Sequence, residues 1–161
     1  MQLYRFSPIE TKETLLEAIA YECATSAKLF TQITGETAPI TSVTIFAHYP
    51  EEFETLKGIQ ATMGTQVGEV LGPRVALHEP ITIGEGVVTH LRIRQPDPYH
   101  GQVGSNDYDI ADYATFKEKF LAAKPNNLRL LVRPDYELIE FWHPDFDVTG
   151  YVLSEPERSK R

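Results

Sequence analysis

The sequence of 161 residues contains one cysteine, Cys23. A single thiol excludes an internal disulfide and a thiolate metal cluster, and this favours a reducing compartment, which we expect to be the cytoplasm. No stretch approaches the roughly 20 apolar residues that a membrane-spanning helix needs, and the first residues lack the apolar run of a signal peptide. The sequence therefore predicts neither secretion nor membrane insertion.

Basic residues are few. Fifteen Lys and Arg stand against 23 Asp and Glu, which gives a formal net charge of -8. Such a chain repels a phosphate backbone unless a local basic stripe outweighs the acidic total, and the sequence shows no such run in the folded region. We therefore expect no nucleic-acid partner.

Apolar and aromatic residues are abundant. Hydrophobic residues make up 42% of the chain, which includes eight Phe, eight Tyr and one Trp. This supply is large enough to build a core, and the length is close to the commonest size of a single domain. We expect one folded domain over 1–161.

The first predicted element is a helix over 8–34. Ser7 can cap it, Pro8 suits the first helical position, and an acid follows three residues after the cap. Apolar residues then recur at roughly helical spacing until Gly35, which can end the helix. Because Cys23 falls on or beside this apolar stripe, we interpret it as a buried structural thiol and not as a nucleophile.

The remaining chain predicts two consecutive βαβββ modules, at 41–94 and 105–153, that form a cupped mixed sheet. The fold class is therefore α+β, with the helix followed by the two modules. The first module is expected to contain a strand at 41–47, a helix closed by Gly64, and strands at 66–71, 74–78 and 87–94. The second is expected to contain a strand at 105–110, a helix at 112–123 capped by Asp112, and strands at 128–132, 137–142 and 148–153.

This tandem order resembles the vicinal oxygen chelate superfamily, which includes glyoxalases, extradiol dioxygenases and antibiotic-resistance proteins. Residues 130–141, LLVRPDYELIEF, are similar to the strand, Pro-Asp turn and strand that usually end the second module. Residues 109–116, DIADYATF, resemble the corner that opens it. Residues 39–42 and 78–80, together with the N-terminal helix, resemble the YecM-like proteins of this superfamily. The likeness covers about 10–155.

The resemblance implies a metal site inside the cup, on strands that open and close each module. It implies that Glu140 is a ligand and that its usual companion is a His. A cation held there would act as a Lewis acid on a bidentate oxygen substrate, in a lyase, isomerase or dioxygenase.

Strand alternation identifies the side chains that share the face of the cup. If Glu140 points inward, Trp142 shares its face. The other groups expected there are Thr44 and His48 with Phe46; His90, Arg92 and Arg94; and Ser105, Asp107 and Asp109.

The sequence departs from the family pattern at these positions. Thr44 and either Ser105 or Asp107 stand where a His is expected, and Arg92 or Arg94 stands where a Glu is expected. A guanidinium cannot ligate a metal, and it neutralises nearby carboxylates by ion pairing. We therefore expect no cofactor. The alternative is a divalent metal (Zn, Ni, Mn or Fe) held by Glu140, His90, His48 and Asp107.

The favoured function is a small-molecule-binding protein of the vicinal oxygen chelate type with a degenerate or unusual metal site. Arg92 and Arg94 would hold an anionic or carbonyl-bearing ligand, oriented by Asp107, Asp109 and Glu140. Thr44 and Trp142 complete the predicted site. The alternatives are the metal-dependent enzyme, a non-catalytic interaction module, or charged residues that merely pair across strands on a wet sheet face. The sequence leaves open whether the protein forms a homodimer.

Overall fold

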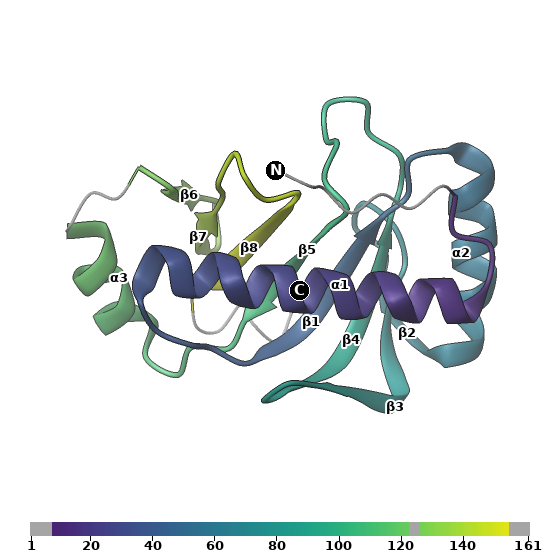
Figure 1. Cartoon of the computed structure of the whole chain (residues 1–161), viewed down its shortest axis with the longest axis horizontal. Coiled ribbons are helices and arrows are strands. Elements are labelled where there is room, and N and C mark those ends of the chain that lie inside the picture. Colours follow the sequence, from purple (N-terminus) through teal and green to yellow (C-terminus); the bar gives the residue numbers. More distant parts are fainter. Residues whose placement is uncertain (1–7, 123–125, 155–161) are drawn as a thin grey trace.

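The computed structural model describes residues 8–122 and 126–154. Over this part of the chain an N-terminal helix is followed by two βαβββ modules, which confirms the predicted α+β class (Figure 1). The elements are α1 (Lys12–Thr34), β1 (Ile40–Phe46), α2 (Pro50–Met63), β2 (Gly64–Gly68), β3 (Arg74–Ile83), β4 (Gly86–Arg94), β5 (Gly104–Tyr108), α3 (Tyr113–Ala122), β6 (Leu128–Val132), β7 (Glu137–Phe141) and β8 (Val148–Leu153).

All these strands form one mixed sheet in the order β2-β3-β4-β1-β5-β8-β7-β6. In each module the first strand pairs in parallel with the last, β1 with β4 and β5 with β8. The two modules meet at the antiparallel pair β1–β5. The sheet order is therefore the same outward from this pair in both directions, and the sheet is cupped and not closed.

The first helix begins four residues later than predicted. The side chain of Thr11 accepts a hydrogen bond from the backbone N–H of Thr14 at 3.1 Å, in a capping box, so Thr11 is the N-cap. Ahead of it, the N–H of Ile9 donates to Glu52 of α2 at 2.7 Å, which holds this segment outside the helix. The predicted cap, Ser7, lies outside the described residues. Gly35 ends α1 in the left-handed conformation, as expected.

Strands β2 and β3 of the first module differ most from their predicted bounds. The strand expected at 66–71 is β2, which starts at Gly64 and ends at Gly68, because the chain then turns through Leu71 and Gly72 at positive φ. Strand β3 continues to Ile83 although Pro80 lies within it. The β3–β4 register shifts between Ala76 and Ile81, so the ladder does not need the missing N–H of Pro80.

The second module follows the prediction more closely. Strands β6 and β8 have the expected bounds, and β7 ends one residue before the expected 142. Asp112 caps α3 by accepting from the N–H of Thr115 at 3.0 Å. The expected last helical residue, 123, lies outside the described part of the chain.

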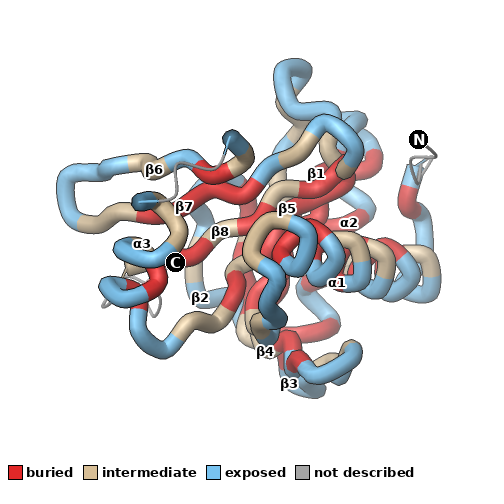
Figure 2. Tube along the Cα trace, turned by 60° about the vertical axis from the view of Figure 1, so that its left-hand side comes forward, coloured by how far each residue is buried: buried red, intermediate tan, exposed pale blue. Residues whose placement is uncertain are grey.

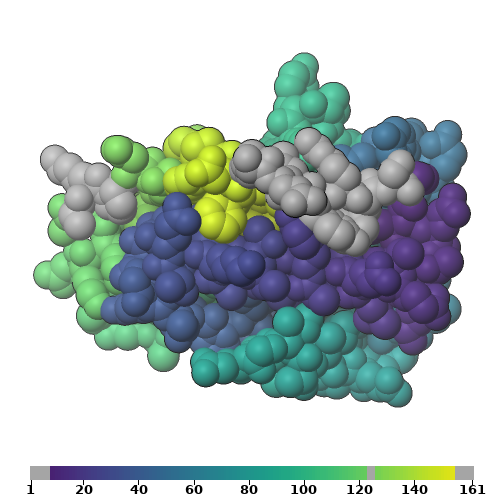
Figure 3. All heavy atoms as spheres, in the orientation of Figure 1, coloured from purple at the N-terminus to yellow at the C-terminus, as the bar shows by residue number. Residues whose placement is uncertain are grey.

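The hydrophobic core lies between the helices and one face of the sheet, here called the helix face. Helix α1 crosses this face (Figures 1 and 3). The ring of Phe30 lies 4.6 Å from that of Tyr108, whose hydroxyl donates to the carbonyl of Ser26 at 2.6 Å. The buried part of the trace runs through the central strands and the inner side of α1, whereas β6 and the loops are largely exposed (Figure 2). Since Tyr108 faces α1, its neighbours along β5 alternate toward the opposite face, the cup face.

The buried residues of α1 include Cys23, as predicted, and two polar side chains. Glu22 is fully buried and accepts a hydrogen bond from Ser26 at 2.7 Å. Burial raises the pKa of Glu22 from 4.5 to about 8, against the opposing effect of the hydrogen bonds from Ser26 and Cys23. The helix face therefore holds a carboxyl group that is protonated at neutral pH.

None of the described helices is long and apolar enough to cross a membrane.

The buried carboxyl of Glu22 predicts a pH-dependent stability. Between pH 4.5 and about 8 the folded state keeps a proton that the unfolded state has lost. Stability therefore falls as pH rises through this window, by at most about 1.4 kcal/mol per pH unit, and levels off above it. Glu22→Gln keeps the shape without titrating, so its free energy of unfolding, measured with urea over this range, should fall less steeply than that of the wild type.

The matched control is Glu17→Gln, which changes an exposed glutamate of the same helix. Its pH dependence should follow that of the wild type. Equal slopes for Glu22→Gln and the wild type would contradict the assignment.

Candidate functional site

A cavity of about 800 Å³ opens on the cup face. It draws side chains from both modules, and its lining is strongly cationic. Of the described residues, five arginines line it: Arg74, Arg92, Arg94, Arg129 and Arg133. The other polar and aromatic lining residues are Thr44, Phe46, Glu69, His100, Ser105, Tyr136, Glu140 and Tyr151.

The sheet register determines which of these side chains are neighbours. Thr44 of β1 lies opposite Arg92 of β4 on one side and Ser105 of β5 on the other. Phe46, two residues further along β1, lies opposite Arg94. The first strands of the two modules therefore place two hydroxyl groups at the centre of the cavity floor, beside the arginines of β4.

Arg74 and Arg92 are directly paired across β3 and β4. Both are buried, with 7% and 8% of their surface exposed. Like charges directly opposite each other destabilise a sheet. The two most buried arginines of the cavity are therefore neighbours on adjacent strands, where their positive charges repel each other.

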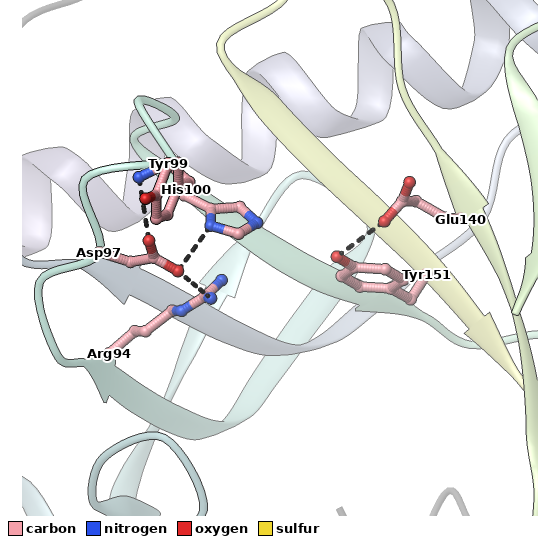
Figure 4. A network of polar contacts seen from close by, with 6 residues as sticks. All are labelled: Arg94, Asp97, Tyr99, His100, Glu140 and Tyr151. Carbon is pink, nitrogen blue, oxygen red and sulfur yellow. Dashed lines mark hydrogen bonds and ion pairs between the residues drawn. The ribbon is translucent and has the colours of Figure 1, made fainter. Parts of the chain in front are cut away.

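Glu140 contributes the buried carboxylate of the opposite wall. It lies on β7 with 8% of its surface exposed, in register with Arg129 of β6 and Tyr151 of β8. Its Oε1 atom pairs with the guanidinium of Arg129. Its Oε2 atom accepts a hydrogen bond from Tyr151 at 3.2 Å (Figure 4). Each carboxylate oxygen of Glu140 is therefore engaged within its own module.

A second polar group lies at the end of β4 (Figure 4). Asp97 pairs with Arg94 at 3.2 Å and with the Nδ1 atom of His100 at 2.7 Å, and it accepts from the N–H of Tyr99 at 2.9 Å. The hydrogen bond from Tyr99 lowers the pKa of Asp97, His100 and Arg94 lower it further, and burial opposes them. The Arg94 guanidinium also lies 4.8 Å above the ring of Phe46.

The cavity is a positive region in an acidic protein. Its five arginines and two glutamates leave a formal charge of +3 with His100 neutral, whereas the chain carries -8. His90 of β4 shares the cup face with Arg92, two residues away. Burial lowers the pKa of His90 below 6.5, the charge of Arg74 lowers it further, and Asp107 acts in the opposite direction.

The predicted ligand-binding residues divide into two groups. The cavity is lined by four of them: Thr44, Arg92, Arg94 and Glu140. Asp107 lies on the cup face, in register with Ser42 and Tyr151, but outside the lining.

Asp109 and Trp142 also lie outside the lining, because each follows the end of its strand. The N–H of Asp109 donates to Pro39 at 2.8 Å, and that of Trp142 donates to Asn127 at 3.1 Å. Trp142 is 40% exposed. Strand alternation no longer applies to either side chain.

The four predicted metal ligands do not gather at one point. Glu140 alone lines the cavity, while His90 and Asp107 lie elsewhere on the cup face. His48 is exposed beyond β1, where its Nε2 atom contacts the carbonyl of Gln102 at 2.9 Å. Among the residues that the structure describes, no group of three or more His, Cys, Asp or Glu side chains could hold a metal ion.

The sequence analysis missed several lining residues, chiefly Arg74, Arg129, Arg133 and Tyr151. Tyr151 could have been found by applying alternation to 148–153, as it was applied to the last strand of the first module. The sequence holds no comparable signal for Arg74 and Arg129, because their positions depend on the register of the outer strands.

The comparisons with known proteins bear on the fold. No family model matches the chain, and no curated protein matches it. A solved structure entitled "Structural Genomics, Protein EC4020" superposes with a TM-score of 0.71 at 11% identity, over 99% of this chain and 96% of that one. At this identity the likeness shows a common fold and nothing of function.

The effect of the Arg74 charge on the pKa of His90 gives a direct test of how close the two side chains lie. Arg74→Met removes the positive charge but keeps much of the side-chain volume, so the pKa of His90 should rise toward 6.5. NMR titration of the imidazole measures this shift.

The control is Arg133→Met, which removes a charge from the other module. It should leave the pKa of His90 almost unchanged. A rise in the control as large as that in Arg74→Met, or no rise in Arg74→Met, would mean that Arg74 does not act on His90.

Proposed function

We propose that the protein binds a small organic anion in the cavity between its two modules, in the manner of a vicinal oxygen chelate protein with a degenerate or unusual metal site. The single observation that supports this most strongly is the in-register burial of Arg74 and Arg92 at the cavity. We place the protein in the cytoplasm, which its single cysteine favours.

The electrostatics of the Arg74–Arg92 pair favour an anionic ligand. Directly opposed residues of an antiparallel pair have Cβ atoms about 5 Å apart. Two guanidinium groups carried by neighbouring side chains repel each other, and the repulsion is stronger where water is excluded. An anion between the guanidiniums accepts charge-assisted hydrogen bonds from both, and replaces repulsion with attraction.

Two other interpretations of the sequence receive less support. A cavity of about 800 Å³ is within the range of small-molecule sites, and a pure interaction module has no need of one. Cross-strand ion pairing accounts for Arg129 with Glu140. It does not make the lining neutral, because five arginines and two glutamates line the cavity.

The metal-dependent enzyme remains the second candidate, because Glu140 lies in the cavity and is the residue that the family resemblance implies as a ligand. Calorimetric titration with zinc, nickel, manganese and iron separates the two proposals. We expect weak binding, since Arg129 and Tyr151 already engage the carboxylate. Micromolar binding that disappears in Glu140→Gln would favour the enzyme.

The anion proposal predicts that Arg74→Met and Arg92→Met each weaken the binding of inorganic phosphate. Loss of one charge-assisted hydrogen-bonding group lowers the binding free energy by about 1.5–3 kcal/mol. The dissociation constant should therefore rise roughly tenfold to hundredfold. Isothermal titration calorimetry at low ionic strength measures it.

Lys28→Met is the matched control, because it removes a positive charge from an exposed position on α1. It should bind phosphate as the wild type does. Equal losses in the control and in Arg92→Met would mean that net charge, and not the cavity, attracts the anion. Retention of full affinity in both cavity variants would contradict the proposal.

A further inference from the structure

We infer that the ligand of the cavity is an amphipathic anion, with a charged group at one end and a hydrocarbon body at the other. Its body packs against Val70 and Leu71 of the β2–β3 turn on one wall and against Leu131 and Leu138 on the other. This inference rests on the proposed function, since it requires an anion in the cavity, and it adds the chemical class of that anion and the residues that select it.

Two consecutive apolar side chains of the β2–β3 turn are exposed to water. Val70 is 71% exposed and Leu71 is 51% exposed, and both line the cavity. Single exposed apolar residues are common on protein surfaces and need no explanation. A neighbouring pair on the wall of a cavity is the kind of surface that small-molecule sites use to contact the apolar part of a ligand. The turn therefore offers apolar surface to a ligand that the arginines attract.

The backbone of this turn is held in an unfavourable conformation. Leu71 has a φ of 61°, in the left-handed region that bulky residues rarely adopt. Its carbonyl accepts a hydrogen bond from the N–H of Gln95 at 3.0 Å, and the carbonyl of Pro73 accepts one from the N–H of Ile93 at 3.1 Å. A Cβ atom on Gly72 would overlap the carbonyl of Ile93. These contacts fix the turn against the end of β4, so the apolar wall is formed before a ligand binds.

The apolar wall lies beside the arginines of β4. Gln95, which holds the turn, directly follows Arg94, and Arg94 and Arg92 both line the cavity. Among the residues that the structure describes, the lining includes five arginines and two glutamates, Glu69 and Glu140, which leaves a formal charge of +3. An anionic group held at β4 therefore has the turn next to it, within reach of the rest of the ligand.

The second module supplies the facing apolar pair. Leu131 of β6 and Leu138 of β7 are register partners, and both line the cavity. They alternate along their strands with Arg129 and Glu140, which pair with each other. Strands β6 and β7 are at the opposite end of the cupped sheet from β2 and β3. The cavity thus has aliphatic side chains on two opposed walls.

These walls favour a hydrocarbon body over a hydroxylated one. Each CH₂ group of the ligand that is removed from water tightens binding by about fourfold. Hydroxyl groups against Val70 and Leu71 would lose hydrogen bonds to water and find no partner in those side chains. The hydroxyl groups of Thr44 and Ser105 lie instead on the floor, in register with Arg92, where they can donate to the charged group.

The body of the ligand is tested with three phosphate monoesters: methyl phosphate, hexyl phosphate and sorbitol 6-phosphate. The last two share a six-carbon chain and differ in their hydroxyl groups, and the charged group is the same in all three. Isothermal titration calorimetry at about pH 7.5 gives the dissociation constants. We expect hexyl phosphate to bind about tenfold or more tightly than methyl phosphate, because the walls cover part of its longer chain. Sorbitol 6-phosphate should bind about as methyl phosphate does.

Two results with these ligands would overturn the inference. One is equal affinity for methyl phosphate and hexyl phosphate. The other is an affinity for sorbitol 6-phosphate as high as that for hexyl phosphate.

The wall itself is tested with Leu71→Asn. Asparagine tolerates the left-handed conformation and is close to leucine in size, so the change removes apolar surface while the turn keeps its shape. We expect the variant to bind hexyl phosphate about fivefold more weakly than the wild type. It should bind methyl phosphate as the wild type does, which also shows that the cavity is intact.

The matched control is Val67→Thr, which changes a valine of β2 that is 52% exposed and outside the lining of the cavity. It should bind both esters as the wild type does. Unchanged affinity of Leu71→Asn for hexyl phosphate, or an equal loss in Val67→Thr, would mean that the turn does not contact the ligand.

A second copy of the chain is the other occupant that could cover the exposed turn. Sedimentation velocity of the wild type and of Leu71→Asn separates this case. We expect the two proteins to have the same mass. A wild-type dimer that dissociates in Leu71→Asn would assign the turn to an interface between copies and would overturn the inference.

Failure of this inference can be distinguished from failure of the proposed function. If Arg92→Met weakens the binding of both methyl phosphate and hexyl phosphate but the wild type binds the two equally, the cavity binds anions without selecting an apolar body. If Arg74→Met and Arg92→Met bind both esters as the wild type does, the proposed function fails and this inference fails with it.

Discussion

The antiparallel pairing of β1 with β5 joins the two modules, and the position of every cavity residue depends on it. Through this pair Ser105 is placed beside Thr44, and through β1–β4 Thr44 is placed beside Arg92. A slip of one residue would turn these side chains toward the core. Gly104 helps to hold the register, because a Cβ atom there would overlap the backbone carbonyl of Thr44. Close approach of the modules therefore requires glycine at this position.

The same strands present apolar side chains on the helix face and polar side chains on the cup face. Between the cavity residues of β4 and β1 lie Leu91, Ile93, Val43 and Ile45, which are fully buried in the core. This core gives the outer strands a rigid support and allows two buried guanidiniums to be held at opposed positions. A less constrained sheet would let them turn to water.

Alternation within strands was enough to predict part of the site. Thr44, Arg92 and Arg94 follow from alternation along the strands predicted at 41–47 and 87–94. Glu140 follows instead from the resemblance of residues 130–141 to the vicinal oxygen chelate pattern. The pairing between strands could not be predicted from the sequence, because Arg74 becomes the neighbour of Arg92 only through the β3–β4 register. The fold class followed from the order of the elements, whereas the start of α1 depended on a contact with α2 that is distant in sequence.

The central claim is that an oxyanion is held between Arg74 and Arg92. A crystal structure of the protein grown with inorganic phosphate tests it most directly. The account predicts electron density for a phosphate ion within hydrogen-bonding distance of both guanidiniums. A phosphate group at another surface, or two guanidiniums turned away from a cavity filled only by water, would contradict the account.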